Sequence, residues 1–63
     1  MLTNKLPYAI KEFVRSQGRV SYPDLLVYFH RFGFTADDIS KAVDILFERA
    51  EIWEPVAGEV ELI

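Results

Sequence analysis

The chain has 63 residues, of which 51% are apolar and 14% aromatic, and its net charge is −3 at pH 7. This length predicts a single domain over residues 1–63, and the apolar content excludes an intrinsically disordered chain. The sequence contains no cysteine, which excludes disulfides and thiolate-bound zinc, so stability is expected to come from side-chain packing.

Residues 5–17 have the apolar spacing of one helix face. The apolar residues that recur every three or four positions are Leu6, Ala9, Ile10, Phe13 and Val14. We expect Asn4 to cap this first helix, Pro7 to fall in its first turn, and Gly18 to end it in a left-handed conformation. Residues 19–21 are too few for a helix and are expected to form a brief strand.

A second helix is expected to begin after Ser21. Ser21 and Asp24 have the spacing of a capping pair, in which each side chain satisfies the other's backbone amide. Gly33 is expected to end this helix, and Phe34 to enter the core from the following turn. The residues of its expected buried stripe are Leu25, Leu26, Phe29 and Phe32.

The third helix is the most regular element, because the capping pair recurs at Thr35 and Asp38 and a long apolar pattern follows. The pattern that predicts its buried face consists of Ile39, Ala42, Val43, Leu46, Phe47 and Ala50. The residues expected to face outward are Asp37, Lys41, Asp44, Ile45 and Glu48. Ile45 is then an exposed apolar residue, as we also expect of Val27 and Tyr8.

Residues 51–54 and 59–63 are expected to form the two strands of a hairpin around a turn at residues 55–58. Because a lone hairpin is marginal in water, Ile52, Val60 and Leu62 are expected to pack on the helices. The order helix, short strand, helix, turn, helix, hairpin predicts an α+β fold. The fold class is a winged helix-turn-helix domain, with three helices and a C-terminal β-hairpin wing.

Residues 50–58, with the sequence Ala-Glu-Ile-Trp-Glu-Pro-Val-Ala-Gly, resemble the close of the C-terminal winged-helix domain of archaeal minichromosome maintenance (MCM) replicative helicases. There a third helix runs into an aliphatic-aromatic-Glu-Pro strand and a glycine-containing wing. Residues 18–24, Gly-Arg-Val-Ser-Tyr-Pro-Asp, also look like that family. Ala50 departs from it, since related domains usually carry glycine there, and these 63 residues include no helicase ATPase core. The resemblance implies a regulatory appendage of DNA replication machinery that does not make the main contacts with DNA.

Charge is divided unevenly along the chain. Residues 1–35 carry five Lys and Arg residues against two carboxylates, whereas residues 36–63 carry two against eight. The outward face of the third helix and the wing are therefore acidic, and a phosphate backbone would be repelled there. DNA binding in the usual winged-helix mode is expected to be weak or indirect. The residues expected to contact a protein partner instead are Lys41, Asp44, Ile45 and Glu48. For Trp53 two roles stay open, structural packing over the outer face of the hairpin and a second anchor for the partner.

Two other functions stay open. One is a DNA-binding regulator that uses a dimer or the basic first-helix side, and its candidate contacts are Lys11, Arg15, Arg19 and Arg31. The same cations also suit a solvated surface or the docking of an acidic protein segment. The other is an assembly module of a different multi-subunit complex.

No enzyme, cofactor or metal site is expected. His30 is the one histidine, and none of Ser16, Ser21 and Ser40 has it at a spacing typical of a nucleophile and its base. Glu59 and Glu61 face the same way, but a domain of this size rarely encloses a cleft. No apolar run approaches the roughly 20 residues needed to span a bilayer, and residues 1–5 do not resemble a signal peptide. We therefore expect a cytoplasmic protein without membrane contact, and the sequence favours no particular oligomeric state.

Overall fold

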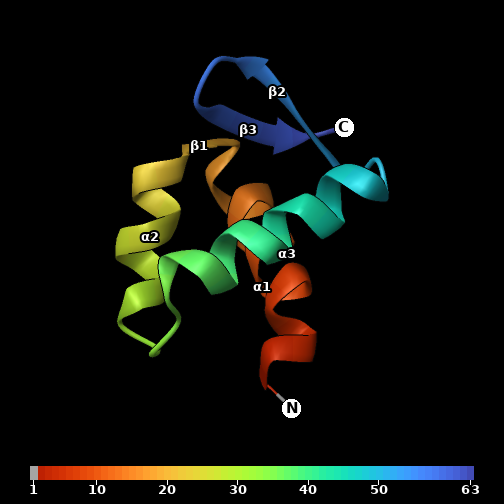
Figure 1. Ribbon diagram of the computed structural model, residues 1–63. Coiled ribbons are helices and arrows are strands. Elements are labelled where there is room, and N and C mark those ends of the chain that lie inside the picture. Colours follow the sequence, from red (N-terminus) through yellow and green to blue (C-terminus); the bar gives the residue numbers. More distant parts are fainter. Residues whose placement is uncertain (1) are drawn as a thin grey trace.

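The computed structural model describes residues 2–63, with side chains from Lys5 onward, and it has the arrangement of a winged helix (Figure 1). Three helices support a three-stranded antiparallel sheet of order β1-β3-β2. The elements are α1 (Leu2–Gln17), β1 (Arg19–Ser21), α2 (Tyr22–His30), α3 (Ala36–Glu48), β2 (Ile52–Val56) and β3 (Glu59–Leu62). The expected α+β winged helix-turn-helix fold is thus confirmed. Figure 1 places the β2–β3 hairpin, the wing, at one end of the molecule.

Helix α1 begins earlier than expected. It starts at Leu2, so Asn4 lies inside the helix and does not cap it, and its side chain is outside the described part of the structure. Pro7 is the sixth helical residue, so its expected place in the first turn is wrong, and its missing N–H removes one helical hydrogen bond. The expectation for Gly18 is confirmed: its φ is +89° and its amide donates to the Val14 carbonyl at 2.8 Å.

Helix α2 buries a narrower stripe than expected. Leu25 and Phe29 are buried, but Leu26 and Phe32 are 37% and 57% exposed, so their expected burial is wrong. The helix ends at His30, and Phe32 therefore leaves the helical path in the turn that follows. At the other end the Ser21 Oγ accepts the Asp24 amide at 3.2 Å, which is one half of the expected capping pair. Phe34 is half-buried against the core, as expected.

Helix α3 begins with both bonds of the expected capping pair. The Asp38 amide donates to the Thr35 Oγ1 at 3.1 Å, and the Thr35 amide donates to the Asp38 Oδ2 at 2.9 Å. The expected face is buried except at its C-terminal end, where Phe47 is half-buried and Ala50 is exposed beyond the helix. Ala50 has a φ of +57°, so the chain turns away before this side chain can reach the core.

The sheet has β3 in its centre, and β2 carries an irregularity. Trp53 pairs with Glu61 and Val56 with Glu59, so three steps along β2 correspond to two along β3. The extra residue forms a β-bulge beside Pro55, a position where proline's missing N–H costs no ladder bond. The turn is therefore shorter than expected, residues 57 and 58, and residues 55 and 56 belong to β2.

The core lies between the sheet and the helices. The expected packing of the hairpin is confirmed, because Ile52 and Val60 are buried and Leu62 packs against the core while half-buried. The buried residues are Leu6, Ile10, Val14, Val20, Leu25, Phe29, Ile39, Ala42, Val43, Leu46, Ile52 and Val60. Helix α3 lies across this core, so its other side is free to contact a partner.

Candidate functional site

The exposed side of α3 carries the residues expected to contact a partner. Lys41, Asp44, Ile45 and Glu48 are all exposed, and with about 100° of rotation per residue they fall within one arc of the helix. We call these four residues the α3 face. Lys41 Nζ lies 3.2 Å from the Asp37 Oδ2, so its positive charge is compensated within the helix. The α3 face is therefore acidic in balance.

A groove between α1 and α3 borders the α3 face on one side. Ile45, which is 37% exposed, lines this groove of about 400 Å³ together with Tyr8 and Arg49. Tyr8 is 66% exposed. The sequence indicated that Tyr8 and Ile45 are exposed, but their meeting depends on how α1 crosses α3 and has no signal in either helix alone. The apolar centre of the α3 face thus continues onto α1.

A second groove, between α2 and α3, borders the α3 face on the other side. Asp44 lines this space of about 310 Å³ with Tyr22 and Leu26. Asp44 and Ile45 are neighbours in sequence but therefore open onto different grooves. A partner that engages both must lie across the exposed ridge of α3.

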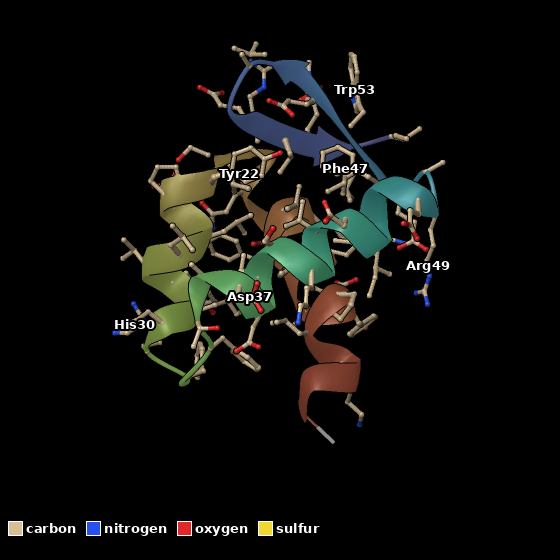
Figure 2. All side chains as sticks on the ribbon, in the orientation of Figure 1. Tyr22, His30, Asp37, Phe47, Arg49 and Trp53 are labelled. Carbon is tan, nitrogen blue, oxygen red and sulfur yellow. The ribbon has the colours of Figure 1, made fainter. Side chains whose placement is uncertain are left out.

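Trp53 does not join the α3 face. It is 48% exposed on β2, and Figure 2 shows its side chain pointing away from the helices, whereas Phe47 lies below it between α3 and the sheet. The structure therefore brings four of the five expected protein-contact residues together and places Trp53 on a separate surface of the wing.

Glu54 ties the wing to α2. The Tyr22 hydroxyl donates to the Glu54 Oε1 at 3.2 Å, and the Gly58 amide donates to the Glu54 Oε2 at 2.6 Å. Burial raises the pKa of Tyr22, and the negative charges of Glu54 and Asp44 raise it further. Sequence reasoning used Glu54 as a negative charge of the wing and as part of the Glu-Pro motif, and did not predict this tether. The sequence pattern that indicates the bond to Gly58 is a carboxylate four residues before the glycine of a tight turn.

The basic residues do not form one patch. Lys11 lines the α1–α3 groove, whereas Arg19 and Arg31 line a depression that they share with Phe13 and Tyr28. Three of the four cations lie near carboxylates, in the pairs Lys11–Glu51 at 3.4 Å, Arg15–Glu12 at 3.4 Å, Arg19–Glu61 at 3.4 Å and Arg19–Glu59 at 3.9 Å. Arg31 instead lies over the Tyr28 ring, with its Cζ 5.0 Å from the ring centre.

The residues considered for chemistry lie apart. His30 is exposed at the end of α2 (Figure 2), Ser21 caps α2, and the Ser16 Oγ donates to the Phe13 carbonyl at 2.9 Å. Within the described part of the chain, no three His, Asp or Glu residues gather around a common point that could hold a metal ion. None of the helices described over residues 2–63 is long and apolar enough to cross a membrane.

The fold and surfaces define a winged-helix domain whose α3 side is acidic. Comparisons with protein-family models, with curated proteins and with solved structures gave no match. What bears on the function of the domain is therefore the distribution of its charges and exposed residues.

Proposed function

We propose that this domain is a non-catalytic interaction module that regulates or scaffolds a larger assembly through protein contacts made by the α3 face. The observation that supports this proposal is the acidic charge of the surface that winged helices commonly present to DNA. The carboxylates on α3 and the wing are Asp37, Asp44, Glu48, Glu54 and Glu59, and the one lysine of α3 is paired with Asp37.

Electrostatics favours a protein partner over DNA at this surface. A phosphate contact gains free energy when a cation releases condensed counterions, but a carboxylate near phosphate is repelled and loses water without gaining a partner. A protein surface with Lys or Arg residues around an apolar pocket avoids both costs. Its pocket would take Ile45, and its cations would approach Asp44 and Glu48.

We propose that this partner belongs to archaeal-type DNA replication machinery in the cytoplasm, and the support for this setting is the resemblance of residues 50–58 to the MCM wing. Ile52, Trp53, Glu54 and Pro55 match the aliphatic-aromatic-Glu-Pro strand, and Gly58 matches the wing glycine. The partner would then be the replicative helicase itself or a subunit bound to it.

A direct binding measurement tests this function. The domain is immobilised and titrated with a purified archaeal-type replicative helicase ring, using wild type, Ile45→Asp and Val27→Asp. We expect Ile45→Asp to weaken binding at least tenfold, because it places a charge in the apolar centre of the contact. Val27→Asp is the matched control, since Val27 is 73% exposed on α2, and it should bind like wild type.

The two possible failures of this test are distinguishable. If the wild-type domain does not bind the ring, the replication setting is wrong. If it binds and Ile45→Asp binds equally well while remaining folded by circular dichroism, the α3 face is not the contact surface.

The second candidate function is DNA binding through the basic side. One observation favours it: Arg31 forms no ion pair with any described residue, and it shares a depression with Arg19. This function predicts tight, salt-dependent binding of duplex DNA that is lost in Arg19→Glu/Arg31→Glu. Lys11→Glu/Arg15→Glu tests the α1 part of the same surface.

A further inference from the structure

An apolar groove lies between α1 and α2, and none of the surfaces described above includes it. Its volume is about 610 Å³, within the range of ligand-binding clefts. Its lining is mostly aromatic and aliphatic. The aromatic residues are Phe13, Tyr28, Phe29, Phe32 and Phe34, and the aliphatic ones are Leu6 and Ala9.

The walls of this groove are fixed by contacts among the aromatic rings. Phe13 and Tyr28 are stacked with ring centres 4.2 Å apart, which joins α1 to α2. Phe29 contacts Phe34 edge-on at 6.4 Å, which joins α2 to the following turn. A groove held open in this way can accept a partner without the cost of ordering its own walls.

Phe32 is the exposed part of this cluster. Its ring lies 5.7 Å from Tyr28 and 6.4 Å from Phe29, yet the residue is 57% exposed. A lone exposed apolar residue is ordinary, but an exposed ring at the edge of an apolar groove extends one continuous apolar surface. Such a surface is typical of a site that a partner covers.

The charges around the groove are positive in balance. Lys5 lines the groove, and Arg31 lies beside it, in the neighbouring depression that shares Tyr28, with its Cζ 5.0 Å from the centre of that ring. Neither cation forms an ion pair within the described part of the chain. The acidic residue at the groove is Glu12, which is paired with Arg15 at 3.4 Å. An incoming carboxylate therefore meets one unpaired cation in the groove, Lys5, and a second beside it, Arg31.

We propose that this groove binds an amphipathic helix of a partner protein that carries large apolar residues on one side and carboxylates at its ends. Both walls are helices whose backbone groups bond internally, so the groove offers no strand edge to an extended peptide. A helix satisfies its own backbone and presents apolar side chains at i, i+3, i+4 and i+7. Lys5 and Arg31 select acidic flanks. This site is separate from the α3 face.

A designed peptide tests the groove. The probe is a capped helical peptide of about 16 residues with Leu and Phe at i, i+3, i+4 and i+7 and two Glu residues at each end. Its matched control replaces those Glu residues by Lys. Titration of the ¹⁵N-labelled domain should give saturable shifts of the Phe13, Tyr28 and Phe32 amides. We expect the Lys-flanked peptide to bind at least fivefold more weakly.

Variants of the domain assign the binding to the groove. Phe32→Ser should weaken binding of the Glu-flanked peptide at least tenfold, whereas Val56→Ser, at a 46% exposed site on β2, should not change it. Ile45→Asp should also leave it unchanged. Arg31→Glu should reduce or reverse the preference for the Glu-flanked peptide, and this result is informative even if Phe32→Ser proves unstable.

Three results would overturn the proposal. The first is that neither peptide binds at concentrations up to about 1 mM. The second is that both peptides bind equally, or that the shifts lie on α3. The third is a concentration-dependent dimer, seen by sedimentation, that Phe32→Ser dissociates, because the groove would then belong to a second copy of this chain.

Discussion

Ala50 holds a position that glycine normally occupies. Its amide donates to the Phe47 carbonyl and the Glu51 amide to the Leu46 carbonyl, both at 3.0 Å, so the end of α3 is a Schellman motif with Ala50 in its left-handed position. This conformation brings the Cβ of an L-residue close to its carbonyl oxygen. Ala50 therefore carries backbone strain that glycine at the same position would avoid.

Replacing Ala50 by glycine should stabilise the domain. Removing the Cβ relieves the strain, partly offset by the greater freedom of glycine in the unfolded chain, and we expect a gain of about 0.5–1 kcal/mol. Urea unfolding followed by circular dichroism measures it. Ala57→Gly is the control, since Ala57 has no positive φ, and it should be neutral or destabilising. A loss of stability in Ala50→Gly would show that the left-handed turn is wrong.

Asp38 should make the stability of α3 depend on pH. The hydrogen bond from the Thr35 amide, together with that from the Thr35 hydroxyl, holds the pKa of Asp38 below its ordinary value. The stabilisation is therefore present above pH about 4 and is lost as the pH falls through the lowered pKa.

The test is urea unfolding of wild type and Asp38→Asn between pH 7 and 2. Asparagine cannot carry the charge, so the variant should be less stable at pH 7, and the difference should shrink toward pH 2. A difference that stays constant over this range would show that the charge of Asp38 contributes nothing to stability.

Residue-scale expectations from local signals succeeded in part, since Asn4 does not cap α1 and one of the two bonds of the Ser21–Asp24 pair forms. The Thr35–Asp38 capping pair needs only a spacing of three residues, and both of its bonds form. Leu26 and Phe32 show the limit, because helical periodicity cannot tell which side of α2 the other helices cover or that the helix ends at His30.

At the scale of elements, the wing depends on a tether that its own sequence does not reveal. Glu54 accepts hydrogen bonds from Tyr22 on α2 and from Gly58 in the turn. The hairpin was predictable from alternation, but the bulge was not, because register depends on which residues of β3 oppose β2. The Glu54 tether likewise depends on Tyr22, 32 positions away.

Removing the hydrogen bonds of Glu54 should destabilise the wing, and the effect should be larger when both bonds are lost than when one is lost. Tyr22→Phe removes one exposed hydrogen bond and should cost about 0.5–1.5 kcal/mol, whereas Glu54→Ala removes both and should cost more. Hydrogen exchange of the Gly58 amide should quicken only slightly in Tyr22→Phe and strongly in Glu54→Ala. Equal exchange of this amide in wild type and Glu54→Ala would contradict the tether.

At the scale of the whole molecule, the fold is one that commonly binds DNA, whereas the acidic charge of its α3 side supports the protein partner that we propose. The order of elements predicted the winged helix, and the charges of residues 36–63 predicted an acidic α3 side. The grooves could not be predicted, since each is formed by two helices and depends on how those helices pack against each other. The α1–α2 groove needs Phe13 beside Tyr28, and the α1–α3 groove needs Tyr8 beside Ile45.

Charge reversal tests whether acidity is what keeps the winged-helix surface from DNA. The variant carries Asp37→Lys, Asp44→Lys and Glu48→Lys, all at exposed positions of α3. Three new phosphate contacts would give a logarithmic salt slope of about −2.7. The variant should therefore bind duplex DNA, and its binding should weaken steeply as salt is raised.

The most direct measurement is the titration of labelled duplex DNA with the wild-type domain and this variant, at low and moderate salt. We expect the wild-type domain to bind more weakly than about 10⁻⁴ M, the weak end of non-specific binding, and the variant to bind measurably. Wild-type binding tighter than about 10⁻⁶ M, lost on raising the salt, would contradict the proposal that this domain acts through protein contacts.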